Sequence, residues 1–265
     1  MVRARKKFGQ HFLEAAWADK VVEAIAPQPA DRFIEIGPGP GALTLRLAPR
    51  VAHITAVEVD EAMVAVLAPR LPPNVELVRQ DFLEFDLGPV VADAPLRVAG
   101  NLPYNVSSPV LFRLLDIYRG TRRLIDAIVM LQLEVAERIE AAAGTREYGV
   151  LAILVRVHAD VRRLLTLPPG AFRPMPEVRS AVIRLQFRPP EHEVPDLGTL
   201  ESLVRTIFTQ RRKTLLNALR PFAESRGRTS GPALEEAGID PRRRPETLTL
   251  AEIARLSRLF SSPQT

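Results

Sequence analysis

The chain contains no cysteine among its 265 residues, and its four histidines are scattered. The absence of cysteine excludes disulfides, thiolate metal sites and cysteine nucleophiles, and the scattered histidines give no reason to expect a metal site. No apolar run reaches the roughly 18 residues that are needed to span a bilayer. The N-terminal stretch MVRARKKFGQHF is basic but lacks the apolar segment of a signal peptide. We therefore expect a cytoplasmic enzyme with no membrane partner.

Positive charge is unevenly distributed along the sequence. Residues 1–100 carry 11 Lys and Arg against 13 Asp and Glu, a net charge of −2, whereas residues 101–265 carry 25 against 18, a net of +7. A basic second half indicates a polyanionic partner. An Arg-rich solvated surface is the alternative that charge alone leaves open.

Short apolar runs alternate with helical stretches through the first two thirds of the chain. We predict strands over Arg32–Ile36, His53–Glu58, Val75–Arg79, Leu96–Ala99 and Ala127–Leu131. Helices are expected from about Ala42 and over Glu61–Ala68, Ser108–Leu115, Glu134–Ala143 and Gly149–His158. This alternation predicts an α/β, Rossmann-like fold with a mostly parallel sheet. Two further strands, Arg163–Leu167 and Ala181–Phe187, are expected to form an antiparallel hairpin on its edge.

A segment rich in proline and charge, RPPEHEVPD at Arg188–Asp196, has the composition of a linker. After it the pattern is helical only, and we expect helices at Leu200–Thr209, Lys213–Ala223, Ala233–Glu236 and Leu250–Phe260. Thr249 is a plausible N-cap for the last of these. The sequence thus predicts an α/β domain over residues 1–188 and a small all-α domain over residues 189–265.

The segment FIEIGPGPGALT predicts a ligand-binding turn between a strand and a helix. Gly37, Gly39 and Gly41 would let the backbone approach a ligand closely at a helix N-terminus. Glu58 ends the next strand, where an acidic residue can accept hydrogen bonds from ribose hydroxyls. Asp81, after the third strand, can hold the amino group of an adenine. This loop alone does not distinguish a methyl donor from a dinucleotide, and a tight turn beside a solvated Glu is the structural alternative.

The tetrapeptide Asn101-Leu102-Pro103-Tyr104 follows a strand at the carboxyl end of the predicted sheet and favours methyl transfer. An exocyclic amine is a poor nucleophile because its lone pair is delocalised into the ring. The Asn101 side-chain oxygen and the Leu102 carbonyl can accept its two hydrogens, and Pro103 fixes the direction of that carbonyl. Tyr104 can stack on a flipped base. No general base is evident, and a buried Tyr in a plain loop is the alternative.

Several segments together resemble one family, the small-subunit ribosomal RNA adenine dimethyltransferases of the kasugamycin-resistance (KsgA/RsmA) type. The resemblance covers nearly the whole chain and rests on KKFGQHFL, EIGPGPGALT, VEVD, QDFL, GNLPYNVSSPVLFRLL, LQLEVAERI, LPPGAFRPMPEVRSAVIRL and FTQRRKTLLNAL. It implies an enzyme that uses S-adenosyl-L-methionine to dimethylate adenine N6 in 16S-type ribosomal RNA during ribosome biogenesis. The implied partner is the immature small ribosomal subunit, and we expect a monomer.

The resemblance also implies roles for individual residues. The cofactor contacts carried over are His11, Leu13, Gly37, Glu58, Asp81 and Asn101. His11 stands where the family often has Asn, so a backbone contact is expected there whatever its side chain does. Phe172 matches an aromatic residue proposed to pack against the target adenine, although the residues alone favour a core position for it.

Two basic groups are expected to contact RNA. Arg211, Arg212 and Lys213 form the strongest basic cluster of the predicted helical domain and match its motif, and phosphate contact is the functional interpretation. Lys6 and Lys7 are expected to touch RNA beside the active site. Arg242–Arg244 is a second candidate cluster. A solvated helix start is the alternative for each of the C-terminal clusters.

Two other functions compete with small-subunit methylation. A macrolide-resistance-type methyltransferase of large-subunit RNA shares the fold, but Leu102 and QRRKTLLNAL favour the small-subunit enzyme. A non-catalytic RNA-binding assembly factor is the alternative from another class, and the intact EIGPGPG and NLPY segments argue against lost activity.

Overall fold

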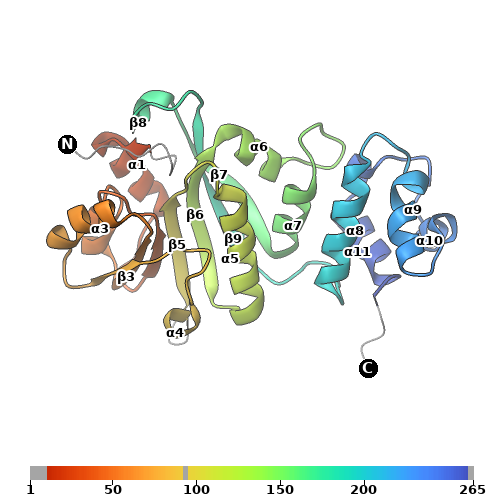
Figure 1. Cartoon of the computed structure of the whole chain (residues 1–265), viewed down its shortest axis with the longest axis horizontal. Coiled ribbons are helices and arrows are strands. Elements are labelled where there is room, and N and C mark those ends of the chain that lie inside the picture. The colour runs from red at the N-terminus through yellow and green to blue at the C-terminus, as the bar shows by residue number, and fades with distance from the viewer. Residues whose placement is uncertain (1–10, 92–94, 262–265) are drawn as a thin grey trace. The chain divides into compact units, whose positions relative to one another are not determined.

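The computed structural model describes residues 11–91 and 95–261, and Figure 1 shows its ribbon. The chain forms two compact units. The first comprises Met1–Ala136 and Asp160–Phe187, and the second comprises Glu137–Ala159 and Arg188–Thr265. Lys6 and Lys7 lie outside the described residues.

A seven-stranded sheet forms the centre of the first unit, in the order β4-β3-β2-β5-β6-β9-β7. Its strands are β2 (Arg32–Ile36), β3 (His53–Glu58), β4 (Val75–Arg79), β5 (Leu96–Asn101), β6 (Leu124–Gln132), β7 (Ala159–Leu167) and β9 (Ser180–Phe187). The strands from β4 through β6 pair in parallel, and β9 pairs antiparallel to β6. The predicted parallel sheet is confirmed, and β7 and β9 are neighbours at its edge, as the hairpin prediction requires.

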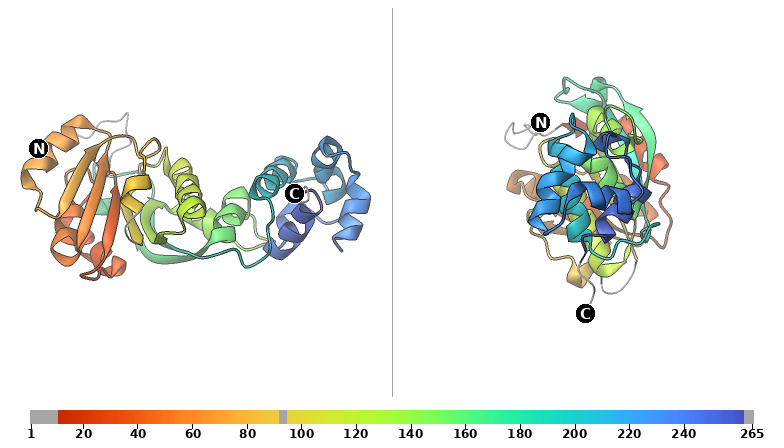
Figure 2. Two further views of the ribbon diagram at one scale, coloured as in Figure 1. Left: turned by 90° about the horizontal axis from the view of Figure 1, so that it is seen from below. Right: turned by 90° about the vertical axis from the view of Figure 1, so that its right-hand side faces the viewer.

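Helices flank the sheet, as the alternating pattern predicts (Figure 2). They are α1 (Ala15–Ile25), α2 (Thr44–Leu47), α3 (Glu61–Leu67), α4 (Gly88–Val91) and α5 (Ser107–Thr121). The sequence prediction omitted α1, although its buried residues Ala18, Val21, Val22 and Ile25 recur at helical spacing. They join the core cluster that contains Phe33 and Ile54 of the sheet.

A small second sheet joins two segments that are far apart in the sequence. β1 (Phe12–Leu13) pairs antiparallel with β8 (Phe172–Arg173), with Phe12 opposite Arg173 and Leu13 opposite Phe172. The amide of Glu14 extends this contact by donating to the Ala171 carbonyl at 2.9 Å. The segment that carries His11 is thereby attached to the segment that precedes β9.

The second unit is helical. It contains α7 (Val150–His158), α8 (Leu197–Thr209), α9 (Leu215–Ser225), α10 (Ser230–Glu236) and α11 (Leu250–Arg258), while α6 (Leu133–Glu140) spans the division between the units. Helix α8 packs against α7, α9 and α11, and α9 packs against α10 (Figure 2). Thr249 caps α11 as predicted, since its hydroxyl accepts from the Glu252 amide and Glu252 reaches back to the Thr249 amide.

The predicted boundary near residue 188 coincides with one passage of the chain between the units, but residues 137–159 group with the C-terminal helices. The contacts around Tyr148 explain this grouping. Its hydroxyl donates to the Leu248 carbonyl at 3.0 Å, and its ring lies edge-on to Phe208. Helix α7, which begins two residues later, packs against α8 and α11 of the same unit, and composition does not reveal these long-range contacts.

Among the described residues, none of the helices combines the length and the apolar character that crossing a membrane requires.

Candidate active site

The order of the central strands reverses between β2 and β5, which places a topological switch point at their carboxyl ends. Open α/β sheets bind ligands at such a point because the loops that leave the two strands diverge there. Gly37 directly follows β2, Glu58 ends β3 and Asn101 ends β5. Asp81 lies two residues after β4. The sheet thus brings four predicted cofactor residues to one edge.

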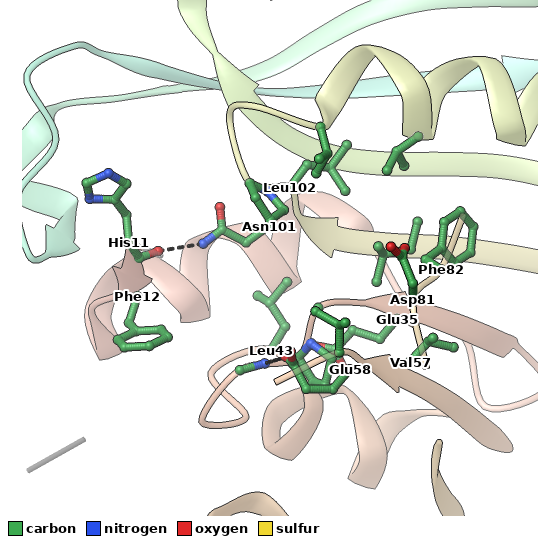
Figure 3. A pocket seen from close by; sticks show the side chains of 18 of the residues that line it. His11, Phe12, Glu35, Leu43, Val57, Glu58, Asp81, Phe82, Asn101 and Leu102 are labelled. Atoms are coloured by element: carbon green, nitrogen blue, oxygen red, sulfur yellow. Dashed lines mark hydrogen bonds between the residues drawn. The ribbon is translucent and has the colours of Figure 1, made fainter. Parts of the chain in front are cut away.

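These residues line a cavity of about 350 Å³. Figure 3 shows that the side chains around it come from the N-terminal segment, the glycine-rich loop and the ends of the central strands. His11, Leu13, Gly37, Glu58, Asp81, Asn101, Leu102, Pro103 and Tyr104 all lie in its wall. Of the predicted catalytic and cofactor residues, all of which the structure describes, Phe172 is the one outside this wall.

The glycine-rich loop has a backbone that favours glycine. Gly37, Gly39 and Gly41 have φ angles of 65°, 55° and 91°, in the left-handed region where a side chain is strained. A Cβ on Gly37 would meet no atom of the described chain within 4 Å, whereas one on Gly41 would lie 2.5 Å from Leu67 Cδ1. The Gly37 amide donates to the Val57 carbonyl at 2.9 Å, which ties the loop to β3.

Glu58 is the acidic residue that the loop holds most firmly. Its Oε2 accepts from the Gly39 amide at 2.9 Å and its Oε1 from the Asp60 amide at 2.8 Å, and the residue is 5% exposed. Burial raises the pKa of Glu58, and the two amides act against that rise. Each carboxylate oxygen can accept a further hydrogen bond, so Glu58 can bind a pair of hydroxyl groups while its position stays fixed.

Glu35 is a site residue that sequence reasoning missed. It lies in β2, lines the cavity and is 1% exposed, and its Oε2 has no hydrogen-bond partner among the described residues. Burial raises the pKa of Glu35 to about 7, although groups of Thr44 act to lower it. The available signal was its place in EIGPGPG, two residues before the first glycine, where a charged residue stands between the apolar residues Ile34 and Ile36.

Asp81 lies on the right of the cavity in Figure 3, across from His11. Its Oδ1 accepts from the Leu83 amide at 2.9 Å, which fixes the carboxylate at the start of a turn. This short local bond orients the side chain without burying it.

Asn101 is oriented by the N-terminal segment. Its Nδ2 donates to the His11 carbonyl at 2.8 Å, so its Oδ1 is directed away from His11 (Figure 3). The amide of Leu102 donates to the Met130 carbonyl at 3.0 Å, which holds the next peptide against β6. The loop therefore presents the Asn101 oxygen as an acceptor on a fixed frame, and it follows that His11 acts here through its backbone.

Tyr104 is held at both its hydroxyl and its ring. The hydroxyl lies 2.8 Å from Ser180 Oγ, and the ring stacks on His11 with centroids 5.3 Å apart and an interplanar angle of 26°. The His11 Nδ1 lies 2.7 Å from the Pro174 carbonyl, which makes this nitrogen the donor. Since His11 covers one face of Tyr104, a base that stacks on this ring must use the opposite face.

The structure contradicts direct access to Phe172. Its ring is 1% exposed and belongs to the core cluster with Leu13, Leu167 and Ala171. The β1–β8 pair accounts for this burial, because it places Phe172 beside Leu13 under the N-terminal segment. Phe172 thus supports the wall that Leu13 forms, and contact with a target base would require this core to open.

The basic cluster of the helical unit is not uniform. Arg211 Nε lies 3.4 Å from Glu246, and its NH2 donates to the Thr145 carbonyl at 3.0 Å. Arg212 and Lys213 are exposed, and neither pairs with an acid within residues 11–91 and 95–261. In the second cluster, Arg243 is bonded to Glu252 and Arg242 to Asp240. Arg212 and Lys213 are therefore better placed than Arg211 to neutralise an external phosphate.

The residues present fit S-adenosylmethionine. The cavity is of the size that binds small cofactors, and its wall combines a close-approach glycine loop with a fixed acceptor pair at Glu58. Glu35 supplies a second carboxyl in the same wall, and its Oε2 has no hydrogen-bond partner among the described residues.

Comparisons with known proteins agree with this geometry. A family model described as ribosomal RNA adenine dimethylase matches residues 1–261. The ribosomal RNA small subunit methyltransferase A of Acinetobacter baylyi is 42% identical over 263 residues, which cover 96% of this chain and 92% of that protein. The crystal structure of a dimethyladenosine transferase from Plasmodium falciparum has a TM-score of 0.77 at 23% identity, covering 93% of this chain and 96% of its own. The crystal structure of the 23S rRNA methyltransferase ErmE has a TM-score of 0.65 at 25% identity, and the match covers 93% of this chain and 98% of that one.

Proposed function

Because the chain belongs to the ribosomal RNA adenine dimethylase family, we propose that it dimethylates adenine N6 in small-subunit ribosomal RNA, using S-adenosyl-L-methionine. The observation that carries this proposal is the fixed Asn101 amide, whose nitrogen is bonded to His11 and whose oxygen is left as an acceptor. Such an acceptor beside a peptide carbonyl suits an exocyclic amine with two hydrogens.

Asn101 and Leu102 orient the nucleophile in this mechanism. The Asn101 oxygen and the Leu102 carbonyl each accept one amine hydrogen, which turns the nitrogen lone pair away from both acceptors and toward the cofactor. S-adenosylmethionine, when bound, supplies an electrophilic methyl group on a positively charged sulfur. As the new N–C bond forms, the sulfur–methyl bond would break and its electron pair would stay on the sulfur, which leaves as a neutral thioether. The methylated amine is acidic and its proton passes to water, so no general base is required. Positioning of this kind contributes much of the rate in such sites.

Tyr104 holds the ring of the adenine. Its hydroxyl bond to Ser180 and the stack on His11 fix its plane before RNA arrives, so the free face offers a preformed platform for a flipped base. Pro103 keeps the Leu102 carbonyl in a fixed direction next to this platform. A preformed platform lowers the cost of ordering the target base.

The cofactor contacts follow from the four strand ends. We assign the ribose hydroxyls to Glu58, the adenine amino group to Asp81 and the close backbone approach to Gly37 and its loop. Leu13 contributes an apolar wall and His11 its backbone. The second unit, with Arg212 and Lys213 exposed, is assigned to RNA phosphates, and Lys6 and Lys7 are proposed to join them.

The end product is expected to be dimethyladenine. After the first transfer one hydrogen remains on the nitrogen, and a single acceptor suffices to hold it. The base can therefore stay on Tyr104 while the new methyl rotates away and the lone pair is presented again. We also propose that the chain works as a monomer, since one chain supplies every residue of the cavity wall. Because the proposed substrate is an immature ribosomal subunit, we expect the reaction to take place in the cytoplasm.

Methyl transfer to separated ribosomal subunits tests the proposal. Labelled S-adenosylmethionine should modify small subunits that lack the methyl groups, and large subunits should stay unlabelled. Asn101→Ala should lose most of the activity, whereas Gln28→Ala, which removes an exposed amide shortly before β2, should not. Labelling of large subunits alone would favour the macrolide-resistance-type activity, and no labelling of either would favour a non-catalytic role.

A further inference from the structure

A short loop with exposed apolar side chains lies between Pro174 and Ser180, which are bonded to two residues of the cavity wall. We define the rim loop as residues 175–179, with the sequence MPEVR, between β8 and β9. Met175 is 64% exposed and Val178 is 43% exposed, whereas Pro176 is buried. Of the five large apolar side chains that are exposed in the described part of the chain, two therefore stand three positions apart in this one loop.

Both ends of the rim loop are bonded to residues of the cavity wall. At one end the Pro174 carbonyl accepts from His11 Nδ1 at 2.7 Å, and at the other Ser180 Oγ lies 2.8 Å from the Tyr104 hydroxyl. The Arg179 carbonyl also accepts from the Leu133 amide at 3.0 Å. The loop is therefore fixed beside the two stacked rings, and Met175 is the residue after the His11 contact.

The charges around the rim loop suit a nucleic acid. Arg173 lies two residues before the loop and Arg179 is its last residue. Both are exposed, and Arg179 pairs with no acid among the described residues. Arg173 lies 3.3 Å from Glu14 at an exposed position, where water screens the pair strongly. Glu177 is the one acid in the loop. One arginine therefore lies on each side of the two exposed apolar residues in the sequence. The arginines can contact RNA phosphates while the apolar side chains pack against bases.

A base that reaches Tyr104 leaves a gap in its own stack. Proteins that open or bend a nucleic acid often fill such a gap with an apolar side chain, and methionine is among the residues they use. Methionine suits an irregular gap because it is unbranched and its sulfur packs well against aromatic rings. Met175 directly follows Pro174, whose carbonyl contacts His11, and the loop that carries it ends at Ser180, which contacts the Tyr104 hydroxyl.

We propose that the rim loop is a wedge for RNA, in which Met175 packs against the bases that the target adenine leaves, with Val178 beside it. Arg173 and Arg179 contact the phosphates on either side. Met175 is then a positioning residue for the methyl transfer, because it stabilises the flipped state without touching the reacting atoms. This inference rests on the proposed function and adds the surface that receives the rest of the RNA strand.

Kinetics on small subunits test the wedge. An apolar wedge offsets part of the cost of unstacking a base step, so Met175→Ala should lower kcat by about tenfold, with cofactor affinity unchanged by calorimetry. Met175→Leu keeps the apolar volume and should stay close to wild type. Ile125→Ala, which removes another exposed apolar residue of the same unit, should have no effect.

A photo-crosslinker identifies what the loop touches. Met175→p-benzoylphenylalanine, irradiated on small subunits, should crosslink to RNA, and ribonuclease should release the product. A crosslink to a ribosomal protein would overturn the wedge and assign the loop to a protein contact. Wild-type kinetics in Met175→Ala would overturn it as well. If wild-type protein itself fails to label small subunits, the proposed function fails first, and the two failures are thus distinguished.

Discussion

Replacing Glu35 by Gln should make the cofactor-free protein more stable at alkaline pH than the wild type. Glu35 is 1% exposed, and its burial raises its pKa from an ordinary value of 4.5 to about 7. An acid with a raised pKa binds its proton more tightly in the folded state. The protonated Glu35 carboxyl therefore makes its full contribution to the free energy of unfolding below pH 4.5. This contribution is lost as the pH rises through about 7. The glutamine side chain of the variant does not ionise and would escape this loss.

The size of the effect follows from the same two values. A pKa difference between 4.5 and about 7 corresponds to about 3 kcal/mol of unfolding free energy in total, of which roughly 2–3 kcal/mol falls between pH 5 and pH 8. Urea unfolding of both proteins across this range should show the stability difference in favour of Glu35→Gln growing with pH. Glu23→Gln, which changes an exposed glutamate of α1, is the matched control and should follow the wild type. Parallel curves for wild type and Glu35→Gln would refute the burial argument.

Four other variants have defined outcomes. Glu58→Ala should weaken S-adenosylmethionine binding by roughly 1.5–3 kcal/mol because a hydrogen-bonded charged partner is lost, and unchanged affinity in calorimetry would remove Glu58 from the site. Replacing Arg212 and Lys213 by Ala should reduce the log–log salt slope of RNA affinity by about 0.7–0.9 for each contact. Arg211→Ala should change this salt slope less because Glu246 already pairs with the Arg211 side chain. A larger change for Arg211→Ala than for the Arg212 and Lys213 replacements would contradict the assignment of phosphate contacts to Arg212 and Lys213. Gly41→Ala should lower stability by about 1–3 kcal/mol, since its φ is 91°, and an unaltered melting temperature would argue against a strained loop.

The parallel sheet and the strand ends that carry Gly37, Glu58 and Asn101 could be predicted from the sequence. Strand and helix periodicity is local, and the glycine-rich turn marks where one strand ends. Helix α1 was missed although its buried residues recur at helical spacing. The membership of residues 137–159 in the helical unit could not be predicted, because it depends on the contact of Tyr148 with Leu248, 100 positions away in the sequence.

The roles of single site residues depended even more on long-range contacts. Asn101 and Glu58 were predicted as acceptors, but the bonds that orient them come from His11 and Gly39. Phe172 lies in the core because β8 pairs with the N-terminal strand β1, a pairing that no short motif encodes. Glu35 is 1% exposed, and the burial that raises its pKa depends on the tertiary structure, so the sequence marks the residue but not its shifted pKa.

Mass spectrometry of nucleosides from small subunits incubated with excess S-adenosylmethionine tests the proposed activity most directly. Wild-type protein should convert the target adenines to N6,N6-dimethyladenine, with monomethyladenine rising early and then falling. Asn101→Ala should form little of either product, because one of the two acceptors that orient the amine is gone. Monomethyladenine persisting as the sole product at long times, or near-normal dimethylation by Asn101→Ala, would contradict the proposed mechanism.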